Sequence, residues 1–117
     1  MPITANGASR KTYAFEKHSI GVAFEDINAV YMYAREESKG GSSVYAPIYI
    51  GKSTELGKRV ANHAHDGVLN CAKQNGANCF LVHHLKLAGI MTAELQLEAI
   101  EKDLLAEHKT PCNTQHN

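Results

Sequence analysis

The sequence lacks a long apolar run and an excess of charge of either sign. No stretch approaches the ~18 consecutive apolar residues that indicate a membrane span, and the N-terminal MPITANGASRKTYAFEKHS has no apolar centre typical of a signal peptide. We therefore expect a cytoplasmic protein. Lys and Arg number 12 and Asp and Glu number 12, so the formal net charge is 0. Because nucleic-acid binding usually rests on a basic surface, evidence for it has to come from local chemistry.

Cysteine is scarce, and the three cysteines form no recognisable set. Cys71, Cys79 and Cys112 are odd in number and match no disulfide spacing of small secreted domains, so we expect reduced thiols. A zinc site that adds His83 and His84 is disfavoured. Zinc ligands usually lie in pairs about two to four residues apart, and adjacent histidines of one strand point to opposite faces.

Two common catalytic motifs are also missing. GKST at 51–54 resembles the end of a phosphate-binding loop, but that loop needs a glycine at the position held by Ala46. The intervening PIYI has strand character, and a strand cannot form a backbone cradle for phosphate. No Gly-x-Ser-x-Gly nucleophile elbow is present.

The length of 117 residues suits a single domain. We expect a flexible tail over 1–12, which is small, polar and aperiodic, and one domain over 13–117. Pro47 predicts an edge position or a bulge within its strand. The polar, Gly- and Ser-rich REESKGGSS is typical of a loop. Strands are predicted over 29–34, 44–51 and 79–87, and helices over about 55–65, 68–74 and 92–108.

This order predicts an α+β domain: a small three-stranded antiparallel sheet flanked by helices, in a β-β-α-β-α arrangement. Side chains two apart in a strand share a face. Tyr31 and Tyr33 should therefore share one face of the first strand, and Tyr45, Tyr49 and Gly51 should share one face of the second. The sequence thus predicts tyrosine faces beside aliphatic ones.

Charged groups interrupt the apolar faces of two predicted helices. Arg59 lies three residues after Leu56 and His63 four residues after Arg59, so both share a helix face with leucine. Glu101 lies four residues after Leu97, within the apolar stripe of the last helix. A carboxylate facing a core is costly unless it is paired or holds a metal.

Two interpretations of these groups stay open. In the first, they form a structural network in which Glu101 pairs with Arg59 and the tyrosines are core residues. In the second, tyrosine, arginine, histidine and glutamate form a site for phosphodiester cleavage. There a carboxylate anchors a divalent ion, an arginine balances charge on the phosphate, and a tyrosine or histidine orients or deprotonates water.

The order of these residues resembles the GIY-YIG nuclease family. AVY at 29–31 and YIG at 49–51 resemble the paired signature, and an arginine, a histidine one turn later, a late-helix glutamate and an asparagine follow. The resemblance covers about residues 28–113. Ala29 departs from the glycine of the signature, and the two motifs are separated by a longer connection than in compact members. Similar domains occur in nucleotide excision repair endonucleases and homing endonucleases.

The resemblance implies a metal-dependent endonuclease acting on DNA, branched or damaged DNA included, with RNA as an alternative substrate. One Mg²⁺ or Mn²⁺ ion would be the cofactor. The oligomeric state is left open, with a homodimer as one option. A second hypothesis is a catalytically inactive module of the same fold that binds nucleic acid or protein.

The resemblance to the nucleases also implies a role for each site residue. These roles are water activation by Tyr31 or Tyr49, phosphate contact by Arg59 and Lys52, proton transfer or phosphate binding by His63, metal binding by Glu101, and support or phosphate contact by Gly51 and Asn113.

Overall fold

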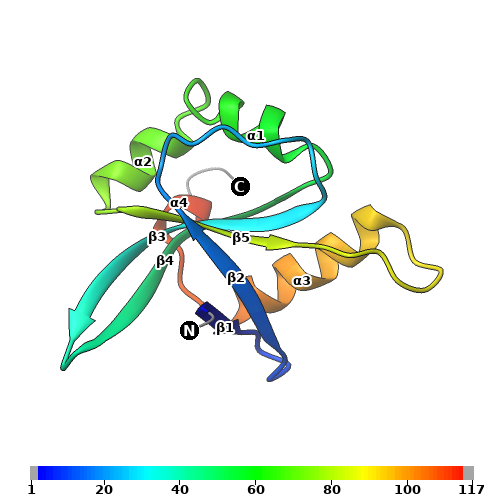
Figure 1. Cartoon of the computed structure of the whole chain (residues 1–117), viewed down its shortest axis with the longest axis horizontal. Coiled ribbons are helices and arrows are strands. Elements are labelled where there is room, and N and C mark those ends of the chain that lie inside the picture. Colours follow the sequence, from blue (N-terminus) through cyan, green and yellow to red (C-terminus); the bar gives the residue numbers. More distant parts are fainter. Residues whose placement is uncertain (1–2, 115–117) are drawn as a thin grey trace.

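The computed structural model describes residues 3–114, which form a curled five-stranded antiparallel sheet and four helices (Figure 1). The spatial strand order is β1-β2-β5-β3-β4, so β4 lies at one edge. No helix of this part of the chain is long and apolar enough to cross a membrane. The strands are β1 Ile3–Asn6, β2 Thr12–His18, β3 Ala29–Lys39, β4 Ser42–Ser53 and β5 Cys79–His84; the helices are α1 Leu56–Asn62, α2 Val68–Gln74, α3 Ala93–Glu107 and α4 Pro111–Thr114.

The prediction of a three-stranded sheet is wrong, although the broad α+β class is correct. The two additional strands come from the N-terminal segment, part of which was expected to be a flexible tail. β1 is only 4 residues long, too short for a periodic hydrophobic pattern. Its order comes from pairing and tertiary contacts instead: β1 pairs with the adjacent β2, β2 pairs with the distant β5, and the turn after β1 hydrogen-bonds to α3 through Ser9 N–H and Asp103 (2.8 Å).

The segment expected to be a polar loop continues β3 and β4 as a two-stranded ribbon, which projects from the sheet (Figure 1). Its turn is Gly40-Gly41, with φ of 57° and 83°. Glycine adopts these left-handed conformations without steric cost, and they match the twist of a tight hairpin. Because both faces of the ribbon are largely exposed, its strands do not need the apolar alternation that identifies a strand in a sequence.

The expected irregularity near Pro47 is confirmed. Tyr33 pairs with Tyr49 and Ala34 pairs with Pro47, so Ile48 is the extra residue of a β-bulge on the edge strand. The bulge reverses the side-chain alternation. Tyr45 packs with the α3 side of the sheet and Tyr49 with the opposite side, so the expectation that they share a face is wrong.

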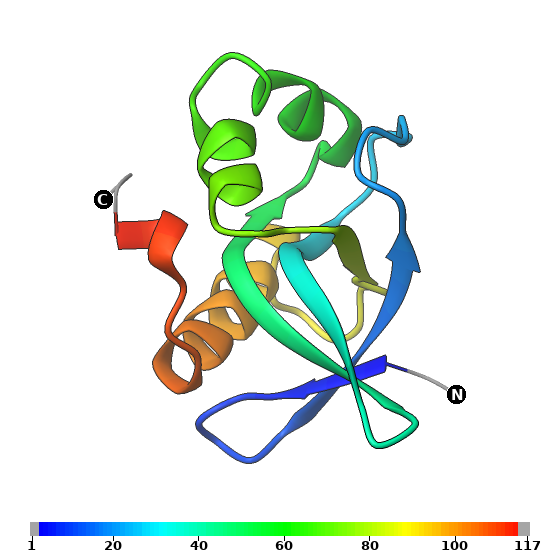
Figure 2. The same cartoon turned by 90° about the vertical axis from the view of Figure 1, so that its left-hand side faces the viewer.

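The sheet separates two cores (Figure 2). One lies under α1 and α2 and includes Tyr31, Tyr33 and Tyr49 beside Leu56 and Phe80. The other lies under α3, and its buried residues include Val30, Met32, Ile50, Leu97 and Leu104. The tyrosine face predicted from Tyr31 and Tyr33 therefore packs against the two short helices.

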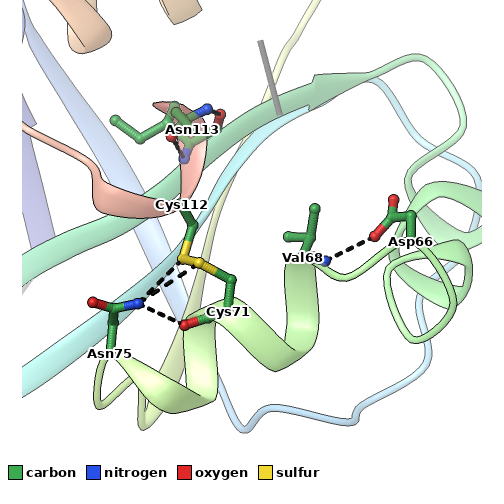
Figure 3. The surroundings of a disulfide bond; sticks show 7 residues. Asp66, Val68, Cys71, Asn75, Cys112 and Asn113 are labelled. Atoms are coloured by element: carbon green, nitrogen blue, oxygen red, sulfur yellow. Dashed lines mark hydrogen bonds between the residues drawn. A yellow bond between two sulfur atoms is a disulfide. The ribbon is translucent and has the colours of Figure 1, made fainter. Parts of the chain in front are cut away.

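The expectation of reduced thiols is wrong for two of the three cysteines. Cys71 of α2 and Cys112 of α4 form a disulfide, with Cα atoms 5.8 Å apart (Figure 3). The side-chain amide of Asn75 donates to the carbonyl of Cys71 (2.9 Å). Cys79 is buried as a free thiol. A separation of 41 residues gives no spacing signal, because the pairing arises only when α4 folds back onto α2.

Loss of the disulfide should lower the free energy of unfolding by about 2–4 kcal/mol, because the crosslink restricts the unfolded chain. Urea unfolding of Cys112→Ser, and of the unmodified chain with and without reductant, measures this difference. Cys79→Ser is the control, since it alters a buried thiol but keeps the crosslink and should still respond to reductant. Equal stability of the oxidised and reduced chains would contradict the prediction.

Candidate functional site

The candidate site lies where the YIG end of β4 meets α1. Tyr31 from β3, Tyr49 from β4 and His63 at the end of α1 pack together. Ring centroids are 6.3 Å apart for Tyr31 and Tyr49, 5.6 Å for Tyr31 and His63, and 5.4 Å for Tyr49 and His63. Tyr33 joins them, 6.1 Å from His63. Residues far apart in the sequence thus form one aromatic cluster around an imidazole.

A short buried hydrogen bond organises the cluster. The hydroxyl of Tyr31 lies 2.6 Å from Nε2 of His63, and both residues are 0% exposed. Burial raises the pKa of Tyr31, and the nearby Tyr49 raises it further, while the neighbouring Arg59 partly opposes both. Tyr31 is therefore a neutral phenol at neutral pH, which can move a proton only if a partner accepts it.

Asp66 is a site residue that the sequence analysis missed. Its Oδ2 lies 3.0 Å from Nδ1 of His63. Its Oδ1 accepts the backbone N–H of Val68 at 3.0 Å (Figure 3). Partial burial alone would raise the pKa of Asp66, but the hydrogen bonds from Val68 and His63 outweigh it and lower the pKa. A histidine followed by an aspartate three residues later was the available signal.

Arg59 places a positive charge at the solvent-exposed side of the cluster. Its exposed side chain interacts with the hydroxyls of both Tyr31 and Tyr49. Burial alone would lower the pKa of Arg59, but the two tyrosines raise it. The guanidinium is thus charged, accessible and adjacent to two phenols, as a group that binds an incoming anion would be.

Gly51 is required by close packing rather than by backbone freedom. A Cβ atom at this position would lie 2.6 Å from both Cζ and Oη of Tyr31, and 2.9 Å from Cε2 of Tyr49. Such contacts are shorter than van der Waals separations allow. The absent side chain therefore makes room for both tyrosines, and any larger residue would displace the phenols from His63.

The Ala29 departure from the family signature has a simple local explanation. Ala29 is fully buried in regular β3, paired with Ser53 on one side and His84 on the other. It is not among the residues with positive φ. Its backbone conformation is therefore open to any L-residue, and only the space is limited.

Glu101 of α3 reaches the same region from the other side of the edge strand. Its carboxyl group is half-buried, and burial raises its pKa, while Lys52 and Arg59 act in the opposite direction. Within residues 3–114, it forms no hydrogen bond and no ion pair within 4.0 Å. The direct Glu101–Arg59 pair of a structural network is therefore absent from this part of the chain, and the two groups interact only at longer range.

The donors near Glu101 suit some metals better than others. No group of three or more histidine, cysteine, aspartate or glutamate side chains in the described part of the chain could enclose an ion. Mg²⁺ binds through one or two carboxylates and keeps several waters, so a single carboxylate with uncommitted oxygens fits Mg²⁺ or Mn²⁺. The same set does not fit a structural zinc site, which needs four nitrogen or sulfur ligands.

Asn113 braces the YIG segment from outside the sheet. Its Oδ1 accepts the backbone N–H of Ile50 and its Nδ2 donates to the carbonyl of Ile50, both at 2.8 Å. Because β4 is an edge strand, these backbone groups have no neighbouring strand, and one carboxamide takes its place. Asn113 follows Cys112, so the disulfide anchors this clamp.

The structure thus brings Tyr31, Tyr49, Arg59 and His63 into one cluster. Gly51 lies beneath the two tyrosines, and Asn113 lies behind them on Ile50. Lys52 is exposed and acts electrostatically on Glu101. The chain matches no family model, no curated protein and no solved structure. The interpretation of the site therefore rests on its own geometry.

Replacing Asn113 by the isosteric aspartate should lower the free energy of unfolding by about 1–3 kcal/mol, because the carbonyl of Ile50 loses its donor. Urea unfolding at neutral pH measures the loss. Asn78→Asp is a matched control, since Asn78 makes the same two bonds with the backbone of Glu36 (2.8 and 3.1 Å), and these bonds are exposed whereas those on Ile50 are partly buried. We expect a smaller loss there, and equal losses would contradict a special role for the clamp on Ile50.

Proposed function

We propose that the protein is a metal-dependent endonuclease of the GIY-YIG type, which hydrolyses DNA phosphodiester bonds. One observation carries the proposal: Tyr31, Tyr49, Arg59 and His63 converge on one cluster at the sheet edge, with the Glu101 carboxyl group close enough to act on it. This set supplies a cation for phosphate, a proton acceptor and a carboxylate for a divalent ion. Metal-dependent phosphodiester hydrolysis can use all three functions together.

Arg59 would bind the scissile phosphate. Its guanidinium presents several donors in a planar fork that matches phosphate oxygens, and it stabilises negative charge that grows in the transition state. In the free protein, this group lies against the hydroxyls of Tyr31 and Tyr49. An arriving phosphate would draw the guanidinium toward itself and uncover those hydroxyls. Lys52, exposed at the end of β4, would add a second phosphate contact.

Tyr31 or Tyr49 would orient and activate the attacking water. Burial raises the pKa of both phenols, so neither is ionised at neutral pH. A neutral phenol can accept a proton from water only while it passes its own proton on. His63 lies at the correct place to receive that proton, 2.6 Å from Tyr31 Oη.

Glu101 would hold one Mg²⁺ or Mn²⁺ ion, which when bound would stabilise charge on the phosphate oxygens. The carboxylate is free to do so because no described residue forms a hydrogen bond or close ion pair with it. Gly51 and Asn113 support the proposal indirectly. They fix the backbone that carries Tyr49.

Substrate and location are part of the same proposal. DNA, including branched or damaged forms, is the proposed substrate, RNA is the alternative, and a homodimer would allow both strands to be cut by one site per chain. A cytoplasmic location is also proposed. Recovery of the Cys71–Cys112 disulfide intact from cells lysed with a thiol-blocking reagent would count against it, because disulfides seldom persist in a reducing cytosol.

A non-catalytic module that binds nucleic acid or protein is the second candidate. The complete burial of Tyr31 and His63 favours it, since the proton-transfer pair has no direct access to solvent in the free protein. The two candidates differ in what substrate binding does. In the nuclease, movement of Arg59 exposes the pair; in the module, the cluster only supports the fold.

Glu101→Gln should lower cleavage of labelled DNA by at least about 10²-fold, the effect typical of losing one electrostatic contact to a transition state. The assay uses duplex, nicked, flapped and branched DNA with Mg²⁺ or Mn²⁺ and with chelator. Glu94→Gln is the matched control, an exposed glutamate on the same helix. Cleavage that survives Glu101→Gln indicates a contaminant, and no cleavage of any substrate favours the non-catalytic module.

Metal binding should depend on pH in a direction that the burial of Glu101 sets. Because its pKa is raised, protons compete with the ion at a higher pH than they would at an exposed glutamate, whose pKa is about 4.3. Without metal, the same shift means that stability falls as pH rises through the folded-state pKa. The rise in Tm caused by Mn²⁺ should therefore be present at neutral pH and disappear on acidification. A Mn²⁺ effect that is independent of pH, or that persists in Glu101→Gln, would contradict this.

A further inference from the structure

We infer that Asp66 is a positioning residue that holds His63 in the tautomer able to accept a proton from Tyr31. The inference rests on the proposed nuclease function for its chemistry. Its geometry stands by itself: Tyr31 Oη, the imidazole of His63 and Asp66 Oδ2 form a continuous chain with distances of 2.6 and 3.0 Å. Asp66 is not among the residues that the GIY-YIG resemblance implies.

The direction of this chain follows from which atoms can donate. An ionised carboxylate only accepts hydrogen bonds, so Nδ1 of His63 must carry the hydrogen that faces Asp66. A neutral imidazole has one N–H, which leaves Nε2 with a lone pair toward Tyr31. The phenol must then donate to Nε2. Asp66 thus determines that Tyr31 is the donor and His63 the acceptor of the buried hydrogen bond, although the imidazole ring separates Asp66 from the phenol.

The linker between α1 and α2 holds Asp66 in place. Oδ1 of Asp66 accepts the N–H of Val68 at 3.0 Å, and Nδ2 of Asn62 lies 3.4 Å from Oδ2 of Asp66. Gly67 separates Asp66 from Val68 and has a φ of 90°, a left-handed conformation that favours glycine. This turn directs the first N–H of α2 back onto Asp66, so the carboxylate is oriented before any substrate binds (Figure 3).

The proton path balances through these residues. The water oxygen forms a bond to phosphorus while the bond from phosphorus to the leaving oxygen breaks. The water proton passes to Tyr31 Oη as the phenol proton passes to His63 Nε2, and the leaving oxygen takes a proton from solvent. The resulting imidazolium is stabilised by the Asp66 carboxylate and later returns its proton to solvent.

Other ionisable groups around His63 come from each neighbouring element. Tyr33 on β3 and Tyr49 on β4 contact the ring from the sheet side. Arg59 on α1 interacts electrostatically with Asp66 and with the two site tyrosines. Arg59 disfavours a second positive charge nearby, and Asp66 favours it. Removing the Asp66 charge should therefore make protonation of His63 harder.

Asp66→Asn tests the inference sharply because the structure predicts which way the amide will turn. The Val68 N–H needs an acceptor, so the amide oxygen should remain on it and the NH₂ group should face Nδ1 of His63. The imidazole must then carry its hydrogen on Nε2 and donate to Tyr31. In that tautomer, Nε2 cannot accept the phenol proton.

The first measurement is a long-range ¹H–¹⁵N correlation of the histidine rings in the purified full chain at neutral pH, without DNA or metal. We expect protonated Nδ1 and unprotonated Nε2 for His63, the reverse in Asp66→Asn, and no change in the control Asp103→Asn. Asp103 is matched because, like Asp66, it accepts one backbone N–H and one side-chain hydrogen bond. The donors are the N–H of Ser9 and the hydroxyl of Tyr13. A protonated Nε2 in the unmodified chain, which needs no variant to fold, would overturn the inference.

The second measurement is the pH dependence of DNA cleavage. Asp66→Asn should lower kcat by about 10²- to 10⁴-fold, the range that general base catalysis contributes. The acidic limb of the profile should also shift to lower pH, because the imidazolium has lost its counter-charge. A folded Asp66→Asn with unchanged kcat and limb would overturn the inference. If the tautomer reverses but the unmodified chain cleaves no DNA, the positioning role stands and the nuclease proposal fails.

Discussion

The hydrogen bond between Tyr31 and His63 is the constraint around which this region is built. It joins β3 to the end of α1 across 32 positions of sequence, and both partners are fully buried. A buried polar group without a partner costs about 1–3 kcal/mol, so this hydrogen bond offsets part of the cost of burying both groups. Space for the phenol comes from Gly51, where any side chain would collide with the Tyr31 ring. The positions of β3, the end of α1 and Gly51 therefore depend on one another.

The edge of the sheet is the second determinant of the arrangement. An edge strand exposes backbone groups that a neighbouring strand would otherwise pair, and at Ile50 a single side chain from the C-terminal segment provides that pairing. The disulfide from α2 holds the preceding residue, Cys112. Support for the YIG segment thus comes from α2 in the middle of the chain and from the C-terminal segment. At this edge Arg59 from one face of the sheet and Glu101 from the other interact electrostatically.

Proton chemistry and charge chemistry occupy different depths of the proposed site. The phenol–imidazole–carboxylate chain begins in the core, where burial raises the pKa of Tyr31 and prevents free ionisation. The cationic side chain of Arg59 is exposed at the surface, and Glu101 is half-buried. A substrate phosphate would therefore meet the cation first. Since Arg59 interacts with the tyrosine hydroxyls, the proposed phosphate binding would be coupled to access to the buried pair.

The sequence determined the local features that depend on neighbouring residues. Periodicity located the three strands β3, β4 and β5 and the helices near them, Pro47 indicated the bulged edge, and charged residues on apolar helix faces indicated Arg59 and His63. Each of these patterns involves residues only a few positions apart in the sequence. The AVY and YIG motifs then indicated that Tyr31 and Tyr49 belong to the same candidate site.

Only the tertiary structure decided the rest, because those features join residues with no local relationship. The disulfide joins residues 41 positions apart, and the clamp of Asn113 on Ile50 joins residues 63 positions apart. The strand β1 pairs with the nearby β2, and the turn after β1 is held to the distant α3 through Ser9 and Asp103. Asp66 differs, because its partners His63 and Val68 are local and the sequence shows their spacing but not the direction of the carboxylate. Its carboxylate is placed by a glycine turn and by the first N–H of the next helix. A pattern of residue types shows which groups are available, whereas the fold fixes the direction in which each one points.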